Sequence, residues 1–236
     1  MTALNAIQEG RLVFQNEACM VKNKLPGESS EFPDEASGAK FPVPVHRLDM
    51  PVSGCLLLAK TPEAAAFLNA AFAGRRVEKR YWAIVEKPAH DALPESGELT
   101  HWLRFDSAKN KSFACKEEGR GRKKAVLRYK VSGTGTHYLF MEIELVTGRH
   151  HQIRAQLAAL GLHIKGDLKY GARRSEKSGG IRLHAYSLAF PNPLQNGERL
   201  KVKTLPPEMD KLWEAFASLS PEMVNDYLDI VNKDAL

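Results

Sequence analysis

The sequence predicts an α+β protein organised on one sheet with few helices. Apolar runs of strand length are more frequent than helical periodicity along the 236-residue chain. Between residues 99 and 146 the runs are short and are separated by Gly, Asn and Asp, a pattern typical of turns between strands. With 43% hydrophobic and 26% charged residues, the composition is that of a soluble globular protein. We expect residues 1–236 to form a single domain.

The N-terminal quarter is expected to consist of strand, loop and strand. Residues 18–21 form a short apolar run that predicts a strand. Residues 23–44 are predicted to be a long loop, because four prolines, two glycines and several acidic residues interrupt any periodicity. The run at 52–59 carries no charge and is mostly apolar, so we expect a strand that is buried on both faces.

A helix is predicted at 62–73. Thr61 can cap its N-terminus, Pro62 suits the first helical position and Gly74 ends the run. The following residues, 77–86, alternate and predict a strand. One face of that strand would carry Val77, Lys79, Tyr81, Ala83 and Val85.

The second half is expected to be rich in strands. The clearest runs are at 125–131, 138–146 and 181–190. Residues 206–236 are predicted to form an acidic C-terminal segment with two helices that are separated by Ser220 and Pro221.

One short amphipathic helix interrupts these strands. Ile153, Leu157 and Leu160 recur at helical spacing, and Gly161 follows the last of them. Arg154 would lie beside this apolar stripe.

Positive charge is clustered rather than spread along the chain. Residues 107–130 contain nine basic and two acidic side chains, and residues 147–182 contain eight and two. Residues 208–236 contain seven acidic and two basic side chains. Such basic clusters are expected of a protein that neutralises phosphates, and equally of solvated basic loops, so charge alone leaves both interpretations open.

Composition and motifs exclude several classes of protein. No run reaches the about 18 apolar residues of a membrane span, and residues 1–10 lack a secretory core. The three cysteines form no CxxC pair, which argues against a disulfide framework and a cysteine zinc site. We therefore expect a cytoplasmic protein with reduced thiols.

Cofactor motifs are also missing from the sequence. It has no GxSxG, P-loop or GxGxxG, so a nucleotide cofactor has no support. His150 and His151 are adjacent and cannot bind one metal from a single helical face. We expect no metal, and these histidines are interpreted as helix-start residues that bond the backbone.

Asp49 places a charged side chain just before a strand that is expected to be buried. An unpaired carboxylate there would cost several kcal/mol, so it must be paired or hydrogen-bonded. By itself Asp49 is either a turn aspartate or a catalytic group. Arg149 and Arg154 suit a phosphate or a buried carboxylate, and Tyr81 suits the core or a platform for a nucleic acid base.

A series of motifs resembles the RluA-type pseudouridine synthases in order and spacing. The similarity runs from about residue 13 to residue 190, and two motifs together are highly specific, HRLD at 46–49 and GRHHQIR at 148–154. Further matches are Asn23-Lys24-Leu25-Pro26-Gly27 with an inserted leucine, Lys79 to Val85, Gly166-Asp167, Tyr170-Gly171 and Leu183-His184-Ala185.

The resemblance implies a catalytic domain with the pseudouridine synthase fold, a mixed, largely antiparallel sheet with a few flanking helices and RNA-binding loops. Such enzymes detach uracil from ribose at N1 and reattach it through C5 without metal or cofactor. Asp49 matches the family's nucleophile, which attacks C6 or C1′, an alternative the sequence leaves open. Arg154 matches the basic residue that pairs with it, and Tyr81 the tyrosine that stacks on the base.

The resemblance also implies RNA contacts. The target uridine would be flipped out of a structured RNA, Arg47 would fill the vacated stack, and Leu183 would close the pocket or be an inward strand residue. The basic loops at 107–130 and 169–182 would hold the RNA backbone. We count His46, Arg149, Lys123 and Lys124 among the RNA-binding residues.

Two features bear on the substrate. Only about a dozen residues precede the first strand, which predicts a core-only member without an N-terminal RNA-binding module, and we expect a monomer. Met50 to Val52 replace polar residues usual after HRLD, and neither ribosomal nor transfer RNA is favoured. The alternative functions are a non-catalytic RNA-binding or ribosome-assembly protein, and a base-removing hydrolase.

Overall fold

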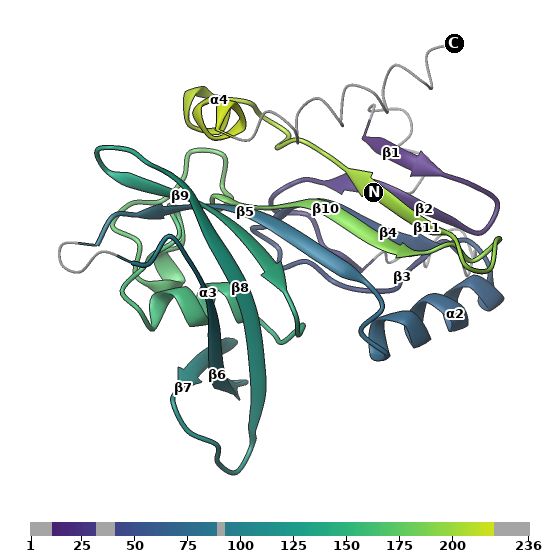
Figure 1. Cartoon of the computed structure of the whole chain (residues 1–236), viewed down its shortest axis with the longest axis horizontal. Coiled ribbons are helices and arrows are strands. Elements are labelled where there is room, and N and C mark those ends of the chain that lie inside the picture. Colours follow the sequence, from purple (N-terminus) through teal and green to yellow (C-terminus); the bar gives the residue numbers. More distant parts are fainter. Residues whose placement is uncertain (1–10, 32–40, 89–92, 220–236) are drawn as a thin grey trace.

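The structure, a computed structural model, describes residues 11–31, 41–88 and 93–219 (Figure 1). These described residues form eleven strands, three α-helices and a short 3-10 helix, η1. The strands are β1 Leu12–Gln15, β2 Cys19–Lys24, β3 Val43–Pro44, β4 Ser53–Ala59, β5 Glu78–Glu86, β6 Ser96–Asp106, β7 Lys111–Cys115, β8 Arg122–Thr134, β9 Tyr138–Leu145, β10 Leu183–Pro191 and β11 Arg199–Lys203. The helices are α2 Pro62–Ala73, α3 Gln152–Ala158, η1 Leu168–Tyr170 and α4 Lys211–Ser218.

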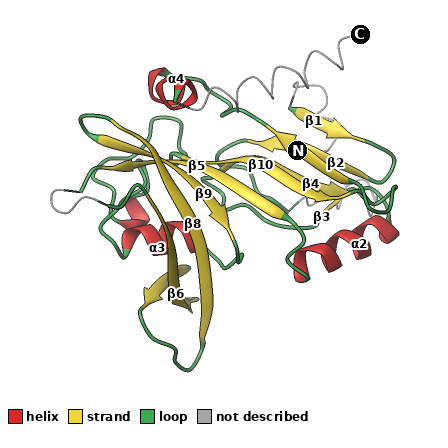
Figure 2. Ribbon diagram, viewed as in Figure 1, coloured by secondary structure: helices red, strands yellow, loops and turns green. Residues whose placement is uncertain are grey.

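All strands of the described chain belong to one sheet. Their order is β1-β2-β4-β10-β5-β9-β8-β6-β7, with β3 paired to β4 and β11 to β10. Every pair is antiparallel except β4 with β10, which is parallel. Figure 2 shows the helices around this sheet, and β6, β7 and β8 leaving it as an arm. The predicted α+β class and the mixed, largely antiparallel sheet are confirmed.

The parallel pair is unusually close at Gly54. Its φ of 121° is in a region that favours glycine, and a Cβ there would lie 2.4 Å from the carbonyl oxygen of Ala185. Any side chain would therefore separate β4 from β10. This contact seats β4, and the Asp49 turn before it, against the strand that begins at Leu183.

The two faces of the sheet are covered by different helices. Ile153 of α3 belongs to the same core cluster as Tyr81 of β5. Trp82, the next residue of β5, points to the opposite face and packs against Phe216 of α4, with ring centroids 4.9 Å apart. We call the first of these faces the inner face and the second the outer face. Helix α2 places Leu68 in a further cluster beside β4 and β10.

Local sequence signals predicted several elements correctly. Helix α2 has the predicted bounds, and the Thr61 hydroxyl accepts a hydrogen bond from the Ala64 N–H at 3.2 Å. Strand β4 is buried along its whole length, as expected. Strands β5, β9 and β10 coincide with the predicted runs to within two residues, and β8 extends three residues beyond each end of its run.

Other predicted elements differ from the structure in their bounds or in their type. The predicted loop 23–44 is shorter, because Asn23 and Lys24 belong to β2 and residues 43–44 form β3; strands β1 and β11 were not predicted. The basic segment 107–130 is mostly strand, not loop, since it contains β7 and the first part of β8. Helix α3 ends at Ala158, and Leu160 is 41% exposed.

Two expectations concern the C-terminal part and the membrane. Helix α4 matches the first of the two predicted C-terminal helices, and the second lies outside the described residues. No helix in the described ranges combines the length and the apolar character that crossing a membrane requires.

Candidate active site

The turn that carries Asp49 is fixed on both sides of this residue. The Ser30 hydroxyl donates to the carbonyl of Leu48 and accepts from its N–H, both at 2.9 Å. On the other side, Lys24 Nζ donates to the carbonyl of Met50 at 3.2 Å. The side chain of Asp49, which lies between Leu48 and Met50, is 23% exposed. The backbone therefore presents Asp49 to solvent from a rigid support.

Lys24 is fully buried, although it lies in β2. Its ammonium also donates to the carbonyls of Leu25 and Glu28, both at 2.9 Å. Burial lowers the pKa of Lys24 to about 8, and the nearby Glu28 carboxylate opposes that shift. The sequence indicated no role for Lys24, because lysine is normally exposed and the carbonyl partners of Lys24 are set by the tertiary fold.

Arg154 joins two aspartates that are distant in sequence. Its Nε and Nη2 donate to the two oxygens of Asp167 at 2.7 and 2.8 Å, and its Nη1 donates to Asp49 Oδ2 at 3.0 Å. The guanidinium is 5% exposed and lies 4.9 Å from the ring centre of Tyr170. Burial opposes the charge of Arg154, but the hydrogen bonds to Asp167 and then the two carboxylates raise its pKa. Arg154 is thus a fixed cation beside Asp49.

His151 lies on the other side of the same carboxylate oxygen. Its Nε2 is 3.6 Å from Asp49 Oδ2, and its Nδ1 is 3.0 Å from the Tyr170 hydroxyl. Burial and the nearby Arg154 lower the pKa of His151 to about 3, so it is neutral at physiological pH. His150 stacks on it and bonds Ser112 Oγ at 3.0 Å. The expectation that both histidines bond the backbone was wrong, because both bond side chains.

Tyr81 and Leu183 share the inner face near Asp49. Leu183 is opposite Ala83 in the register of β10 and β5, and Tyr81 is two residues along β5 on the same side. Their exposed fractions are 7% and 3%, and both belong to the main core cluster. Burial raises the pKa of Tyr81, and the negative charge of Asp49 adds to this effect.

Arg47 and His46 point in different directions. Arg47 has a side chain that is 71% exposed, with Glu31 as its partner at 3.3 Å. His46 instead accepts the N–H of Leu57 at 3.0 Å and stacks on Phe72 of α2, with ring centroids 5.0 Å apart. Burial lowers the pKa of His46 to about 3. The His46 ring thus packs beside α2 and is half-buried, and its expected contact with RNA stays a prediction.

The expected phosphate contacts at 123 and 124 lie on a strand. Both lysines are exposed on β8, and successive side chains of a strand point to opposite faces. Ala125 packs under α3, so Lys123 shares the inner face with Asp49 and Lys124 lies on the outer face. Arg149 is exposed and its Nε donates to the carbonyl of Lys124 at 3.1 Å.

A shallow pocket of about 280 Å³ adjoins the pair of Arg154 and Asp167. Its other walls come from Pro51 and from the segment 166–181, which includes part of the second basic region. Among the described residues, no three His, Cys, Asp or Glu side chains form a group suited to a metal ion.

The sequence model of one family matches residues 15–159, and that family is described as RNA pseudouridylate synthase. The matched segment is more than half of the chain. The chain belongs to this family. The predicted family is confirmed, and with it the enzyme class of its members, isomerases that act on RNA.

Several curated relatives are similar to this chain. An uncharacterised RNA pseudouridine synthase of Zymomonas mobilis is 36% identical over 63% of the chain and 67% of its own length. Ribosomal large subunit pseudouridine synthase D of the same organism is 31% identical over 75% of the chain and 57% of its own length. tRNA pseudouridine synthase C of Vibrio parahaemolyticus is 34% identical over 72% of the chain and 73% of its own length.

Solved structures of similar fold support the architecture. Human RNA pseudouridylate synthase domain containing 4 matches 92% of the chain and 95% of its own, with a TM-score of 0.68 and 21% identity. Human RNA pseudouridylate synthase domain containing 1 matches 92% and 93%, with a TM-score of 0.66 and 23% identity. The predicted pseudouridine synthase fold is confirmed.

Proposed function

We propose that this chain is an RNA pseudouridine synthase in which Asp49 is the nucleophile. The observation that carries the proposal is the state of its carboxylate. Oδ2 accepts a hydrogen bond from Arg154, whereas Oδ1 has no hydrogen-bond partner among the described residues. A nucleophile requires an oxygen that is oriented yet free, and the hydrogen bond from the buried Arg154 orients the Asp49 carboxylate.

The reaction would proceed as an isomerisation. Asp49 attacks the uridine at C6 of the base or at C1′ of the sugar, and both alternatives remain. The bond between N1 and C1′ breaks, the uracil turns, a bond between C5 and C1′ forms, and the bond between Asp49 and the nucleotide breaks, which releases the carboxylate. C5 loses a proton and N1 gains one, so the nucleotide keeps its mass and no cofactor is needed.

The neighbouring side chains have supporting roles in this proposal. Arg154 holds Asp49 in one orientation, Tyr81 stacks on the target base, and Leu183 closes the pocket against the ring. Both apolar groups are on the inner face behind Asp49, where base stacking would be shielded from water. Arg47 is exposed beside this site and would fill the gap that a flipped uridine leaves in the RNA stack.

The substrate would be a structured RNA, either ribosomal or transfer RNA. One relative is named for the large ribosomal subunit and another for tRNA, so the names favour neither. Exposed cations such as Lys123 and Arg149 suit contacts with the RNA backbone.

Pseudouridine mapping tests this function. RNA from cells with and without the gene is treated with carbodiimide and analysed by primer extension, and the purified protein is then added to RNA from the deletion strain. We expect a specific stop that the wild type restores and Asp49→Asn does not, because the amide keeps the shape but loses the nucleophile. Asp210→Asn, a change of the same type in an exposed carboxylate that caps α4, is the control and should restore the stop.

Three results would contradict the proposal. Asp49→Asn activity within about tenfold of the wild type would show that Asp49 is not the nucleophile. Tight RNA binding by the wild type without any pseudouridine would indicate a non-catalytic RNA-binding protein. A loss of mass from the RNA would indicate a base-removing hydrolase.

A further inference from the structure

The arm formed by β6, β7 and β8 has one face that no described helix covers. On its inner face, Leu103 and Ala125 pack beneath Ala155 of α3. On the outer face, α4 packs further along the sheet, against Trp82 and Phe140 of β5 and β9. Figure 1 shows the arm extending away from α4. We call the outer surface of the arm the arm platform.

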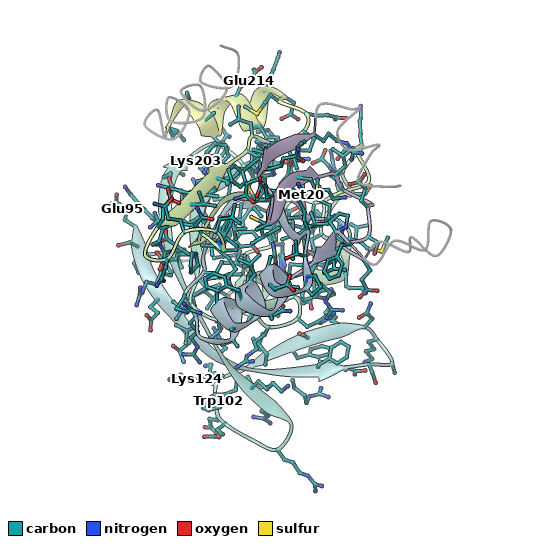
Figure 3. The ribbon with its side chains drawn as sticks, turned by 90° about the vertical axis from the view of Figure 1, so that its right-hand side faces the viewer. Met20, Glu95, Trp102, Lys124, Lys203 and Glu214 are labelled. Atoms are coloured by element: carbon teal, nitrogen blue, oxygen red, sulfur yellow. The ribbon has the colours of Figure 1, made fainter. Side chains whose placement is uncertain are left out.

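Cross-strand pairing defines the arm platform. Residues directly opposite in antiparallel strands point to the same side of the sheet, and positions two apart along a strand do so too. Arg104 of β6 is opposite both Phe113 and Arg122, and Trp102 is opposite both Cys115 and Lys124. Two rows of side chains thus lie side by side, and Trp102 and Lys124 are labelled close together on the arm in Figure 3. The arm platform consists of Trp102, Arg104, Phe113, Cys115, Arg122 and Lys124.

These side chains combine exposed cations with aromatic rings. Arg104 and Lys124 are exposed, and Trp102 and Phe113 are partly exposed. The guanidinium of Arg104 lies 5.3 Å from the centre of the Phe113 ring. Trp102 belongs to none of the core clusters of the described residues. The rings therefore do not serve the packing of the protein interior.

The charge of the arm platform differs from that of the rest of the outer face. Arg80 and Arg128 lie on the same face, and each is paired with carboxylates within 4 Å. In contrast, the described residues provide no carboxylate within that distance of Arg104, Arg122 or Lys124. The cations of the arm platform can therefore contact phosphates, and the aromatic rings beside them can stack with bases. Both properties suit the binding of a nucleic acid.

We propose that the arm platform binds a single-stranded segment of RNA, on the sheet face opposite Asp49. This rests on the proposed function only in that the segment would belong to the same RNA that enters the active site. Bases of a single strand can stack on Trp102 and Phe113, whereas those of a duplex have their faces covered. Lys123 and Lys124 point to opposite faces of β8, so positive charge continues from the inner face to the arm platform.

Fluorescence titration with a single-stranded oligonucleotide tests the platform. The chain has three tryptophans, and Trp82 and Trp213 are only 1% and 5% exposed, so quenching reports mainly on Trp102. We expect quenching in the wild type. Trp102→Phe should keep the affinity within about threefold but lose most of the quenching, whereas Trp102→Ala should weaken binding by at least about fivefold. The absence of quenching at saturation would overturn the proposal.

Charge variants supply an independent test with a matched control. Arg104→Ala with Lys124→Ala should reduce the slope of log K against log salt by about 1.4, if each contacts one phosphate of a single strand. Arg128→Ala is the control. Arg128 lies on the same face but is paired with carboxylates, so its removal should leave the slope and the affinity almost unchanged. Melting temperatures check that all variants fold. An unchanged slope in the double variant would overturn the proposal.

Competitors and an inactive background complete the design. A perfect duplex of the same sequence that quenches Trp102 equally well, or polyglutamate that displaces the RNA from the platform, would each overturn a single-strand RNA site. All binding is measured in Asp49→Asn protein, so the result does not depend on turnover. If the wild type forms no pseudouridine but the platform variants lose RNA, only the proposed function fails; if pseudouridine forms and the variants bind normally, only the platform fails.

Discussion

Arg154 and Arg182 are each held between two carboxylates, yet the two sites differ in the carboxylate oxygens that they leave without a hydrogen bond. Arg154 bonds Asp167 and Asp49, and Arg182 bonds Glu176 and Asp210. Each guanidinium also lies over an aromatic ring, that of Tyr170 or Trp213. The architecture of the two networks is therefore the same.

The difference lies in the outer carboxylate of each network. Asp210 is the N-cap of α4 and accepts the N–H groups of Leu212 and Trp213, both at 3.2 Å, besides its two bonds from Arg182. Asp49 caps no helix, and one of its oxygens has no described partner. A fully bonded carboxylate fastens a helix, whereas a half-bonded one remains able to react. Pairing with arginine therefore does not by itself distinguish a structural aspartate from a reactive one.

Removing each arginine should produce the largest contrast. Arg154→Ala should lower turnover by at least about a hundredfold and destabilise the fold by roughly 3–5 kcal/mol, because Asp167, only 2% exposed, is left as an unpaired buried charge. Arg182→Ala should keep turnover within about threefold and cost roughly 1–3 kcal/mol. Single-turnover assays and urea unfolding measure both. Full activity in Arg154→Ala would break the comparison.

Acidification should remove the stabilisation that the network of Arg182, Glu176 and Asp210 gives to the fold. Burial opposes ionisation of Glu176, but hydrogen bonds from Arg182 and Lys165 outweigh it and keep its pKa below the usual 4.5. A carboxyl whose pKa is lowered in the folded state stabilises the protein above its unfolded pKa, and this stabilisation is lost as the pH falls through the folded value. The difference in unfolding free energy between the wild type and Arg182→Ala should therefore be full at neutral pH and shrink below about pH 4.5. A difference that stays constant down to pH 3 would contradict the assignment.

The smallest effect is expected at Lys123, a cation outside both networks. It is exposed on the inner face and has no carboxylate within 4 Å among the described residues. Lys123→Ala should leave the melting temperature unchanged and reduce the slope of log K against log salt by about 0.7 for one phosphate of a single strand. RNA titrations at several salt concentrations measure this slope. If it does not change, Lys123 is merely solvated.

The sequence predicted the elements whose signals lie within a few neighbouring residues, and it missed those that depend on contacts between distant parts of the chain. Helix α2 was predicted to its last residue because its cap, its proline and its final glycine all act within the helix itself. Strand β1 was missed, since its four residues show no alternation and form a strand by pairing with β2. Tertiary contacts of this kind leave no local pattern.

The same distinction applies to the site. The pair of Asp49 and Arg154 spans 105 residues, and only the family resemblance suggested it. Ser30, Lys24 and Asp167 were assigned no role, because their partners are brought together by the fold. His46 and Arg47 are adjacent in the motif, yet the fold gives them different partners, the Leu57 N–H for His46 and Glu31 for Arg47.

The parallel pairing of β4 with β10 also has a consequence for the time at which the site is assembled during translation. Ser53 and His184, which are hydrogen-bonded at 2.9 Å across this pair, are 131 residues apart. A nascent chain thus carries the Asp49 turn and the apolar strand β4 long before β10 leaves the ribosome. In that interval β2 can cover one edge of β4 and β3 can pair with its end at Leu58 and Ala59, while the edge at Ser53 and Gly54 stays open to wrong partners. We expect a chain released before β10 to be both inactive and prone to aggregate, so that activity appears only after β10 has been synthesised.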